Sequence, residues 1–338
     1  MIKTMLEKLL EGNELTFNEA EEVASLLISG KVNNSQIAAL LTALHIKGET
    51  PIEIAGFAIA MRNNGIKINT FTKNTIDVCG TGGDNSNSFN ISTAVAFVVA
   101  GAGVNVAKHG NRSITSKSGS SDVLSELGVN IELTPEQSAK ALEEIGIAFL
   151  FAPIYHPAMK NVAPVRLELG FKTIFNVLGP LTNPANTIRQ MIGTFNNSIA
   201  KKMAEASKLL EMDRVAFVCT NNQYDEITLT DKTTIIELNN SIITTKEIDA
   251  NTFGYDTIDL SDIEGGTPND NAQIIFDLFS SGARSIHFNV VAANAALALY
   301  TSGNFDNMRE AQNAAEDSVL NGKALKKLKQ LINFGKEL

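Results

Sequence analysis

The chain has 338 residues, of which 44% are hydrophobic and 19% are charged, a composition typical of a globular protein with one large or two ordinary cores. Its formal net charge of −9 argues against a nucleic acid or a membrane surface as the partner, and no segment is long and apolar enough to span a membrane. The first residues carry acids throughout and the chain has only two cysteines, so we expect no signal peptide, no disulfide framework and a reducing cytoplasm.

The first 70 residues have a helical pattern. A capping-box pattern starts one helix at Thr16 and another at Thr50, and glycines at Gly30 and Gly65 end them. Between these helices, residues 35–46 place apolar side chains at three- and four-residue spacing. The pattern predicts a small all-helical unit.

From residue 75 onward, short apolar runs alternate with helical patterns. The apolar runs are 75–78, 104–107, 129–133, 147–151, 190–194 and 214–219, and the helices between them are 92–102, 121–127, 134–146 and 198–212. Such alternation predicts an α/β domain with a mostly parallel sheet and helices on its faces. Residues 225–247 contain three β-rich runs, which favour antiparallel strands at a sheet edge. The chain after Thr267 is helical again and includes a buried helix at 290–300.

A glycine-rich segment, CGTGGD at 79–84, follows the first of these strands and precedes a helix that starts near Ser92. Glycines allow the backbone N–H groups to turn toward an anion, and the helix N-terminus adds a positive dipole end. The spacing differs from both the dinucleotide and the Walker fingerprints. Taken alone, the segment is also compatible with an ordinary tight turn. Cys79 borders it, and a small residue closing a strand is a better interpretation than a reactive thiol.

The second polar segment, KHGNRSITSKSGSSD at 108–122, follows the strand at 104–107. Lys108 and Arg112 supply positive charge, and hydroxyls and backbone amides can surround phosphate oxygens. A flexible linker would have a similar composition. Both segments lie at carboxyl ends of strands, where open parallel sheets bind their ligands, so the pair predicts a site for a phosphorylated, metal-bound substrate.

Three further features carry chemical groups. Asp225 and Glu226 are adjacent carboxylates beyond a strand end and suit Mg²⁺ bound together with substrate phosphates, although such a pair is commonly a solvated turn. Arg166 could orient a substrate carboxylate through two parallel hydrogen bonds, or lie on the outer face of a short helix. His109 and His156 have no acidic partner nearby in sequence that would indicate a general base.

These motifs resemble those of the anthranilate phosphoribosyltransferases, which share their fold with the pyrimidine nucleoside phosphorylases. The resemblance covers nearly the whole chain through ordered matches: GTGGD at 80–84, NIST at 90–93, KHGNR at 108–112, SKSGS at 116–120, HPAM at 156–159, PVR at 164–166, TIFN at 173–176, LGPLTNP at 178–184 and DE at 225–226. It implies a small all-helical domain over 1–70, with a hinge contribution from about 162–184. It also implies a large α/β domain over 71–338, with a mostly parallel mixed central sheet and helices on both faces.

The resemblance further implies that the enzyme transfers the 5-phosphoribosyl group of phosphoribosyl pyrophosphate (PRPP) to anthranilate, in tryptophan biosynthesis. The positions that it assigns to PRPP are Gly80, Gly83, Asp84, Ser88, Asn90, Ile91, Ser92, Thr93, Lys108, His109, Gly110, Asn111, Arg112, Ser113, Ile114, Thr115, Ser116 and Ser120. It assigns Gly80, Asn111 and Arg166 to anthranilate, and Ser92, Asp225 and Glu226 to a pair of Mg²⁺ ions in each monomer. No residue is assigned to the chemical step with certainty. A homodimer formed through the helical domain is implied as well.

The sequence departs from the family pattern at two positions. Ser88 replaces the usual threonine and keeps its hydroxyl, and Lys172 stands where an arginine is common. Two other interpretations stay open at this point. A pyrimidine nucleoside phosphorylase would reveal itself by phosphorolysis of thymidine or uridine, and a relative that binds nucleic acid would need a basic groove, which an acidic chain does not favour.

Overall fold

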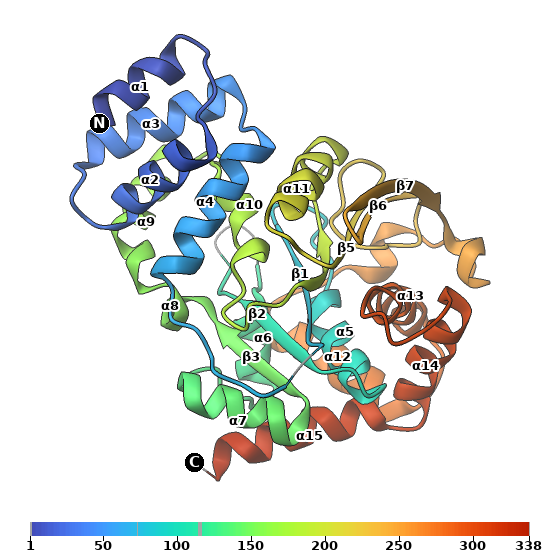
Figure 1. The fold of residues 1–338 in the computed structure, drawn as a ribbon. Helices are drawn as coiled ribbons and strands as arrows, with labels where there is room; N and C mark the ends of the chain where they lie inside the picture. Colours follow the sequence, from blue (N-terminus) through green and yellow to red (C-terminus); the bar gives the residue numbers. More distant parts are fainter. Residues whose placement is uncertain (1, 73, 114–116, 338) are drawn as a thin grey trace.

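The computed structural model describes residues 2–72, 74–113 and 117–337. Seven strands form one sheet (Figure 1): β1 (Ile76–Gly80), β2 (Val106–Gly110), β3 (Ile147–Phe151), β4 (Arg189–Gly193), β5 (Arg214–Thr220), β6 (Thr233–Asn239) and β7 (Ile242–Ile248). The helices of the N-terminal unit are α1 (Ile2–Leu10), α2 (Phe17–Ile28), α3 (Asn34–Lys47) and α4 (Pro51–Asn64). The later helices are α5 (Ile91–Gly101), α6 (Ser120–Glu126), α7 (Pro135–Ile145), α8 (Ala152–Tyr155), α9 (Ala163–Leu169), α10 (Phe175–Leu178), α11 (Asn197–Leu209), α12 (Pro268–Ser281), α13 (Ile286–Thr301), α14 (Met308–Leu320) and α15 (Lys323–Lys336). Short 3₁₀ helices are η1 (Pro157–Asn161), η2 (Pro180–Thr182), η3 (Ala250–Phe253) and η4 (Leu260–Ile263).

The sheet has the strand order β3-β2-β1-β4-β5-β6-β7. The first five strands in this order pair in parallel, and β6 and β7 add an antiparallel hairpin at one edge. Along the chain, β2 and β3 are added on one side of β1, and β4 and β5 are then added on its other side, so the strand order reverses direction at β1. Ligands of open α/β sheets bind at the carboxyl ends of strands near such a reversal, which here are the ends of β1, β2 and β4.

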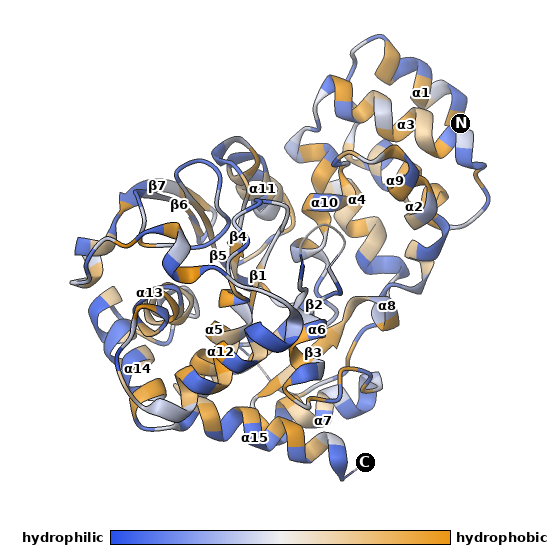
Figure 2. Ribbon diagram, turned by 180° about the vertical axis from the view of Figure 1, so that it is seen from behind, coloured by the Kyte–Doolittle hydropathy of each residue, from blue (hydrophilic) through white to orange (hydrophobic). Residues whose placement is uncertain are grey.

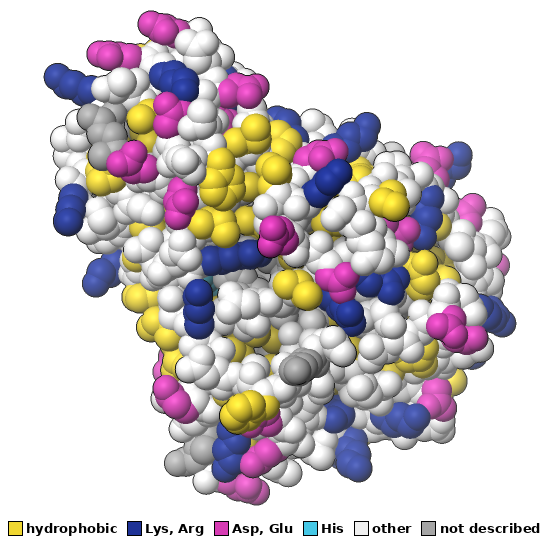
Figure 3. Space-filling model, viewed as in Figure 1, with side chains coloured by type: hydrophobic (Ala, Val, Ile, Leu, Met, Phe, Trp, Pro, Cys, Tyr) yellow, Lys and Arg dark blue, Asp and Glu magenta, His cyan; other side chains and the backbone are white. Residues whose placement is uncertain are grey.

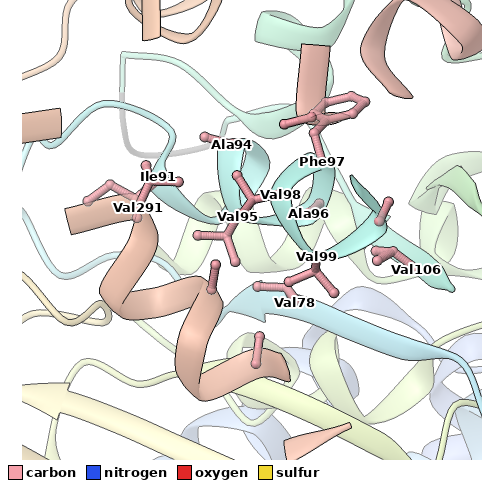
Figure 4. Close-up of a cluster of buried hydrophobic side chains, with 14 of the residues drawn as sticks. Val78, Ile91, Ala94, Val95, Ala96, Phe97, Val98, Val99, Val106 and Val291 are labelled. Atoms are coloured by element: carbon pink, nitrogen blue, oxygen red, sulfur yellow. The ribbon is translucent and has the colours of Figure 1, made fainter. Parts of the chain in front are cut away.

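Helices cover both faces of the sheet, as the alternation predicts. On one face α5 packs with α13, α14 and α15, and Figure 4 shows Val95 and Val99 of α5 close to Val78 of β1 and Val106 of β2. The other face packs against α11 and the N-terminal helices. Successive residues of a strand alternate between the faces, so Met191 belongs to the first core and the next residue, Ile192, to the second. Figure 2 shows the hydropathy of each residue along the same ribbon, seen from behind.

The N-terminal helices form the separate lobe seen in blue in Figure 1, and α9 and α10 lie beside it. Helix α9 contacts α3, and α10 contacts α4. Val165, Phe175 and Leu181 are buried in the same hydrophobic cluster as the N-terminal helices. Both predicted capping boxes are present, with Thr16 and Thr50 as N-cap residues. The exact division at residue 70 and the assignment of 162–184 to the helical domain stay predictions.

Three sequence-based expectations differ from the structure. Strand β2 ends at Gly110 rather than at residue 107, because it pairs with β3 as far as Phe151, so the loop starts three residues later than expected. Residues 129–133 are extended but form no strand, since they bury alternate side chains without a neighbouring strand. The region 225–247 contains two strands rather than three, because Ile227 hydrogen-bonds to the side chain of Asn294 instead of to a strand.

None of the helices in the described ranges has the length and apolar character needed to cross a membrane.

Candidate active site

The glycine loop starts where β1 ends at Gly80. Gly82 and Gly83 have φ values of 67° and 72°, a left-handed conformation that glycine adopts without strain. The backbone N–H of Gly82 donates a hydrogen bond of 2.9 Å to the Asp225 carboxylate. A Cβ atom at Gly80 would lie 2.6 Å from Asp225 Oδ2. The close approach of Asp225 therefore favours glycine at position 80, whereas the turn itself favours glycine at positions 82 and 83.

Asp225 and Glu226 follow β5 and a tight turn at 220–224. The Thr220 hydroxyl donates to the Glu226 carbonyl oxygen at 2.7 Å. Asn294 of α13 accepts from the Ile227 N–H at 3.0 Å and donates to the Ile227 carbonyl at 2.8 Å. A Cβ atom at Gly193, the last residue of β4, would overlap the Asp225 carbonyl oxygen. The acidic pair is thus held by a strand, a buried helix and a strand end that only glycine fits.

The carboxylates of this loop lie together with Asp84 of the glycine loop. The Asp225 N–H donates to Asp84 Oδ2 at 3.3 Å, and the Ser92 N–H at the start of α5 donates to Glu226 Oε1 at 3.2 Å. Desolvation and the neighbouring Asp84 raise the pKa of Asp225, and desolvation and Asp225 raise the pKa of Glu226. Both side chains nevertheless keep part of their surface open to solvent. Each residue is therefore partly open to solvent and close to a second carboxylate, a position at which a bound cation would favour the ionised form.

These residues fit a magnesium ion. No ion pair joins Asp84, Asp225 or Glu226 to a lysine or arginine in the described part of the chain. Hard oxygen donors with excess negative charge suit Mg²⁺, which commonly takes only one or two carboxylates from the protein. Among the described residues, no three His, Cys, Asp or Glu side chains form a complete metal cage. The remaining ligands would have to come from water, a hydroxyl or a substrate.

Lys108 links the two predicted anion loops. Its side chain is 3% exposed, and its ammonium donates to the Val78 carbonyl at 2.6 Å and to the Ser92 hydroxyl at 3.3 Å. Burial lowers the pKa of Lys108, whereas the charges of Asp77 and Glu226 raise it. A buried cation therefore lies between β1, β2 and the N-terminus of α5, next to the acidic loop.

The loop after β2 is organised around Asp122. Its carboxylate accepts from the Ser113 N–H at 3.2 Å and the Gly119 N–H at 3.0 Å, and Arg112 lies 3.3 Å from it. The Ser120 hydroxyl donates to the Asn111 carbonyl at 3.3 Å. The predicted PRPP positions Ile114, Thr115 and Ser116 lie outside the described residues.

Two predicted positions, Ser88 and Asn90, lie between the glycine loop and α5, and two more, Ile91 and Thr93, lie in the first turn of α5. Asn90 caps the start of α5 without a side-chain cap bond; its amide donates to the Ser118 carbonyl at 3.3 Å, and its oxygen accepts from Asn271 at 2.8 Å. The Ser88 hydroxyl lies 3.1 Å from that of Ser86. Ile91 and Thr93 are buried at 1% and 0% exposure, and the Ile91 side chain packs into the core. Ile91 could therefore contact a ligand through its backbone but not through its side chain.

Arg166 and Lys172 come from the segment packed on the N-terminal helices. Arg166 Nη2 lies 3.5 Å from Asn176 Oδ1, and its guanidinium lies over the Phe175 ring. Lys172 donates to the Gly83 carbonyl at 2.7 Å, with its ammonium 3.5 Å from the Phe195 ring centroid. Lys172 therefore reaches the glycine loop, whereas the hydrogen bond of Arg166 within the described ranges goes to Asn176 and not to Asn111.

The environments of His109 and of the two cysteines favour structural roles over catalytic ones. Burial and the neighbouring His156 lower the pKa of His109 to about 3, so its ring is neutral at physiological pH. His109 Nδ1 bonds to the Gly179 carbonyl at 3.1 Å, which places the ring proton on Nδ1 and engages it with the backbone. Burial raises the pKa of both thiols, Cys79 and Cys219, which argues against a nucleophilic role.

The structure brings Gly80, Asp84, Ser92, Lys108 and the acidic pair into one site at the carboxyl edge of the sheet. The sequence interpretation missed several residues that support it: Asp77, Asn183, Gln190, Gly193 and Asn294. Two of these carry a signal in the sequence. Asp77 is a charge within an apolar strand, and Asn294 is an amide within an apolar helix, and buried polar groups of this kind are normally hydrogen-bonded.

A cavity of about 250 Å³ lies elsewhere, between β5, β6, β7 and the end of α13, and contains none of the predicted site residues. The chemistry of the side chains locates the site better than this hollow does. The face in Figure 3 carries basic and acidic side chains side by side, without a continuous basic groove.

Comparison with known proteins identifies the family. Residues 72–325 match the glycosyl transferase family, a/b domain, and residues 3–65 match the glycosyl transferase family, helical bundle domain. Anthranilate phosphoribosyltransferase of Acetivibrio thermocellus is 43% identical over 99% of this chain and 96% of the relative. The same enzyme of Desulforamulus reducens is 43% identical over 100% of this chain and 98% of the relative.

Solved structures agree with this match. Anthranilate phosphoribosyltransferase of Thermus thermophilus superposes with a TM-score of 0.92 and 36% identity, over 98% of this chain and 99% of that one. The enzyme of Saccharomyces cerevisiae in complex with PRPP and Mg gives a TM-score of 0.91 and 26% identity, over 100% of this chain and 98% of that one. The predicted fold is confirmed, and the full-length matches favour the first of the three sequence interpretations. The chain belongs to the anthranilate phosphoribosyltransferase family of pentosyltransferases.

Proposed function

We propose that the protein transfers the 5-phosphoribosyl group of PRPP to the amino group of anthranilate, releasing diphosphate, as a step of tryptophan biosynthesis. The observation that carries this proposal is the convergence of the glycine loop, Lys108 and the half-buried Asp225–Glu226 pair at one edge of the sheet. A diphosphate that leaves from a sugar requires anion donors and a divalent cation close together, and this edge offers both.

PRPP would lie across the two loops. Backbone N–H groups of the glycine loop and of α5, hydroxyls of Ser88 and Ser120, and the charge of Lys108 would hold its phosphates. The His109 ring is engaged with Gly179, so His109 would contribute through its backbone. The solved relative bound to PRPP and Mg supports this class of ligand.

Ser92, Asp225 and Glu226 would hold a pair of Mg²⁺ ions, with Asp84 as a further carboxylate beside them. Bound Mg²⁺ would neutralise the charge that builds up on the departing diphosphate. The protein's own contribution is to fix these oxygens: Gly82 donates a backbone N–H to Asp225 Oδ2, and Ser92 donates one to Glu226 Oε1.

Anthranilate would bind on the side of Arg166, with Gly80 and Asn111 completing its site. A guanidinium can hold a carboxylate by two parallel hydrogen bonds and so direct the amine toward the sugar. Cleavage of the C1–O bond builds positive charge on the ribose ring. An aromatic amine is unprotonated at neutral pH, so no strong general base is required.

We place the protein in the cytoplasm as a homodimer formed through its helical unit, without a nucleic acid or membrane partner. Leu10, Ile46 and Ile52 of that unit are 70%, 80% and 41% exposed, and Figure 3 shows hydrophobic side chains gathered beside it. Exposed apolar side chains of this kind are common at protein interfaces.

The test is the loss of anthranilate fluorescence when purified protein, PRPP and Mg²⁺ are combined. We expect a loss that requires all three, and no phosphorolysis of thymidine or uridine. No loss with active-site-intact protein would refute the proposal.

A substitution pair tests the anthranilate side. Arg166→Ala should raise the KM for anthranilate and leave the KM for PRPP unchanged, whereas Arg309→Ala, at an exposed position on α14, should change neither. An unchanged KM for anthranilate in Arg166→Ala would remove Arg166 from the site.

A further inference from the structure

Four consecutive backbone carbonyls, those of residues 179–182, each accept a hydrogen bond from a different side chain. His109 Nδ1 bonds to Gly179 at 3.1 Å, Gln190 Nε2 to Pro180 at 2.7 Å, Arg62 Nε to Leu181 at 2.7 Å and His156 Nε2 to Thr182 at 3.0 Å. We call residues 179–183 the connector. The backbone carbonyls of such a segment usually accept hydrogen bonds from water or from the turn itself. Here a side-chain donor on each carbonyl fixes the position of the connector.

The donors come from separate parts of the molecule. His109 and Gln190 belong to β2 and β4, on the sheet face that carries the second core, and Arg62 belongs to α4 of the N-terminal helices. Asn183, at the end of the connector, donates from one amide group to the buried Asp77 carboxylate of β1 and to the Ala107 carbonyl of β2, both at 2.8 Å. The connector is thus bound to three neighbouring strands and to the helical unit at once.

Arg62 is the one member of this set that belongs to the N-terminal helices. It is half-buried, and burial lowers its pKa. Its Nη2 lies 3.9 Å from the Met212 sulfur, and no carboxylate among the described residues forms an ion pair with it. Desolvating a guanidinium is costly unless it is hydrogen-bonded. The bond to Leu181 therefore gives this arginine a specific partner in the connector.

The connector also lies between the two halves of the site. Upstream of it, the segment with Arg166 and Lys172 packs on α3 and α4. On the other side, the strands that it grips, β1 and β2, end at Gly80 and Gly110, where the PRPP loops start. The position of the connector therefore sets the spacing between the anthranilate side and the phosphate side.

We propose that Arg62 is a positioning residue of the transfer reaction: by holding the Leu181 carbonyl it fixes the Arg166 side of the site against the PRPP loops. This inference rests on the proposed function. It predicts a selective effect, because the proposed PRPP site lies on the sheet loops, whereas in-line attack needs both sides in register.

The experiment compares Arg62→Gln, Arg62→Lys and Arg189→Gln with the full-length wild-type protein. Arg189 is the control, since it is half-buried and donates to a carbonyl away from the connector, that of Ser302 at 2.7 Å. Unlike Arg62, it also pairs with a carboxylate, that of Asp213 at 2.8 Å. Initial rates give the KM for each substrate and kcat, and calorimetry measures Mg²⁺·PRPP binding without anthranilate.

For Arg62→Gln we expect about a tenfold loss in kcat/KM for anthranilate, the size of one lost charge-assisted hydrogen bond, with PRPP binding unchanged. Arg62→Lys keeps a donor for Leu181 and should recover most of the loss. Arg189→Gln should lower the melting temperature with kinetics within about twofold of wild type. Unchanged kinetics in Arg62→Gln, or equal losses for both substrates, would overturn the proposal. A wild-type protein without transfer activity would instead refute the proposed function.

Discussion

Asn294 offers a sharp test of how the acidic loop is held. Its side chain accepts from the Ile227 N–H at 3.0 Å and donates to the carbonyls of Ile227 at 2.8 Å and Val290 at 2.9 Å, and all of it is buried. Asn294→Ala leaves the buried N–H and C=O of Ile227 without partners. At 1–3 kcal/mol for each of the two unsatisfied groups, the loss in unfolding free energy should be about 2–6 kcal/mol.

The same substitution should weaken magnesium use, because Glu226 directly precedes Ile227. Loss of a residue that orients a metal ligand typically costs about 10- to 100-fold in metal affinity or activity. We therefore expect the Mg²⁺ concentration for half-maximal rate to rise at least about tenfold. Urea unfolding and a Mg²⁺ titration of the initial rate measure the two effects.

Thr301→Val is the control on the same helix, since the Thr301 hydroxyl donates only to the Leu297 carbonyl, at 2.8 Å. It should cost about 1 kcal/mol and leave the Mg²⁺ dependence unchanged. An Asn294→Ala protein that is destabilised but keeps the wild-type Mg²⁺ dependence would refute the reasoning.

Two other predictions concern residues around the site. Lys172→Met removes the 2.7 Å hydrogen bond to the Gly83 carbonyl, so the KM for PRPP should rise about tenfold. In Lys172→Arg the KM for PRPP should stay within about threefold of wild type. Equal KM values in the two variants would contradict this role of Lys172. Desolvation raises the pKa of the buried Asp77 from 3.8 to about 6, so the folded state holds this proton more tightly than the unfolded state. The contribution of Asp77 to the free energy of unfolding should therefore fall by about 3 kcal/mol as the pH rises from about 4 to 6. Asp77→Asn lacks this titration, so its unfolding free energy relative to wild type should rise by the same amount over that pH range. A pH-independent difference would show that the Asp77 pKa is not raised.

The sequence predicts the layers and the main chemistry of this protein well, because the helix caps, the strand alternation and the glycine loop are local signals. It places Lys108 at the start of a loop, since a lysine rarely ends a buried strand. The structure has Lys108 inside β2, buried against Ser92. This burial depends on the register with β3 and on Asp77 and Glu226, which are distant in sequence.

The supporting contacts are the least predictable part. Gly193 is required because the acidic loop, 32 residues further along the chain, approaches its Cα, and nothing local to Gly193 indicates that approach. The connector looks like a proline-containing turn in the sequence, whereas its carbonyls are bound by side chains from β2, β4, α4 and the turn before η1. Such partners become visible only when the helical unit and the sheet are placed together.

The central claim is that acidic side chains at the sheet edge hold PRPP through magnesium. Calorimetric titration of PRPP into the wild-type protein and into the Asp225→Ala/Glu226→Ala double variant, each with Mg²⁺ and with a chelator, tests it most directly. We expect strong binding only for the wild-type protein with Mg²⁺, and a folded double variant that binds PRPP weakly under both conditions. PRPP binding by the double variant that equals the wild type, or wild-type binding unaffected by the chelator, would contradict it.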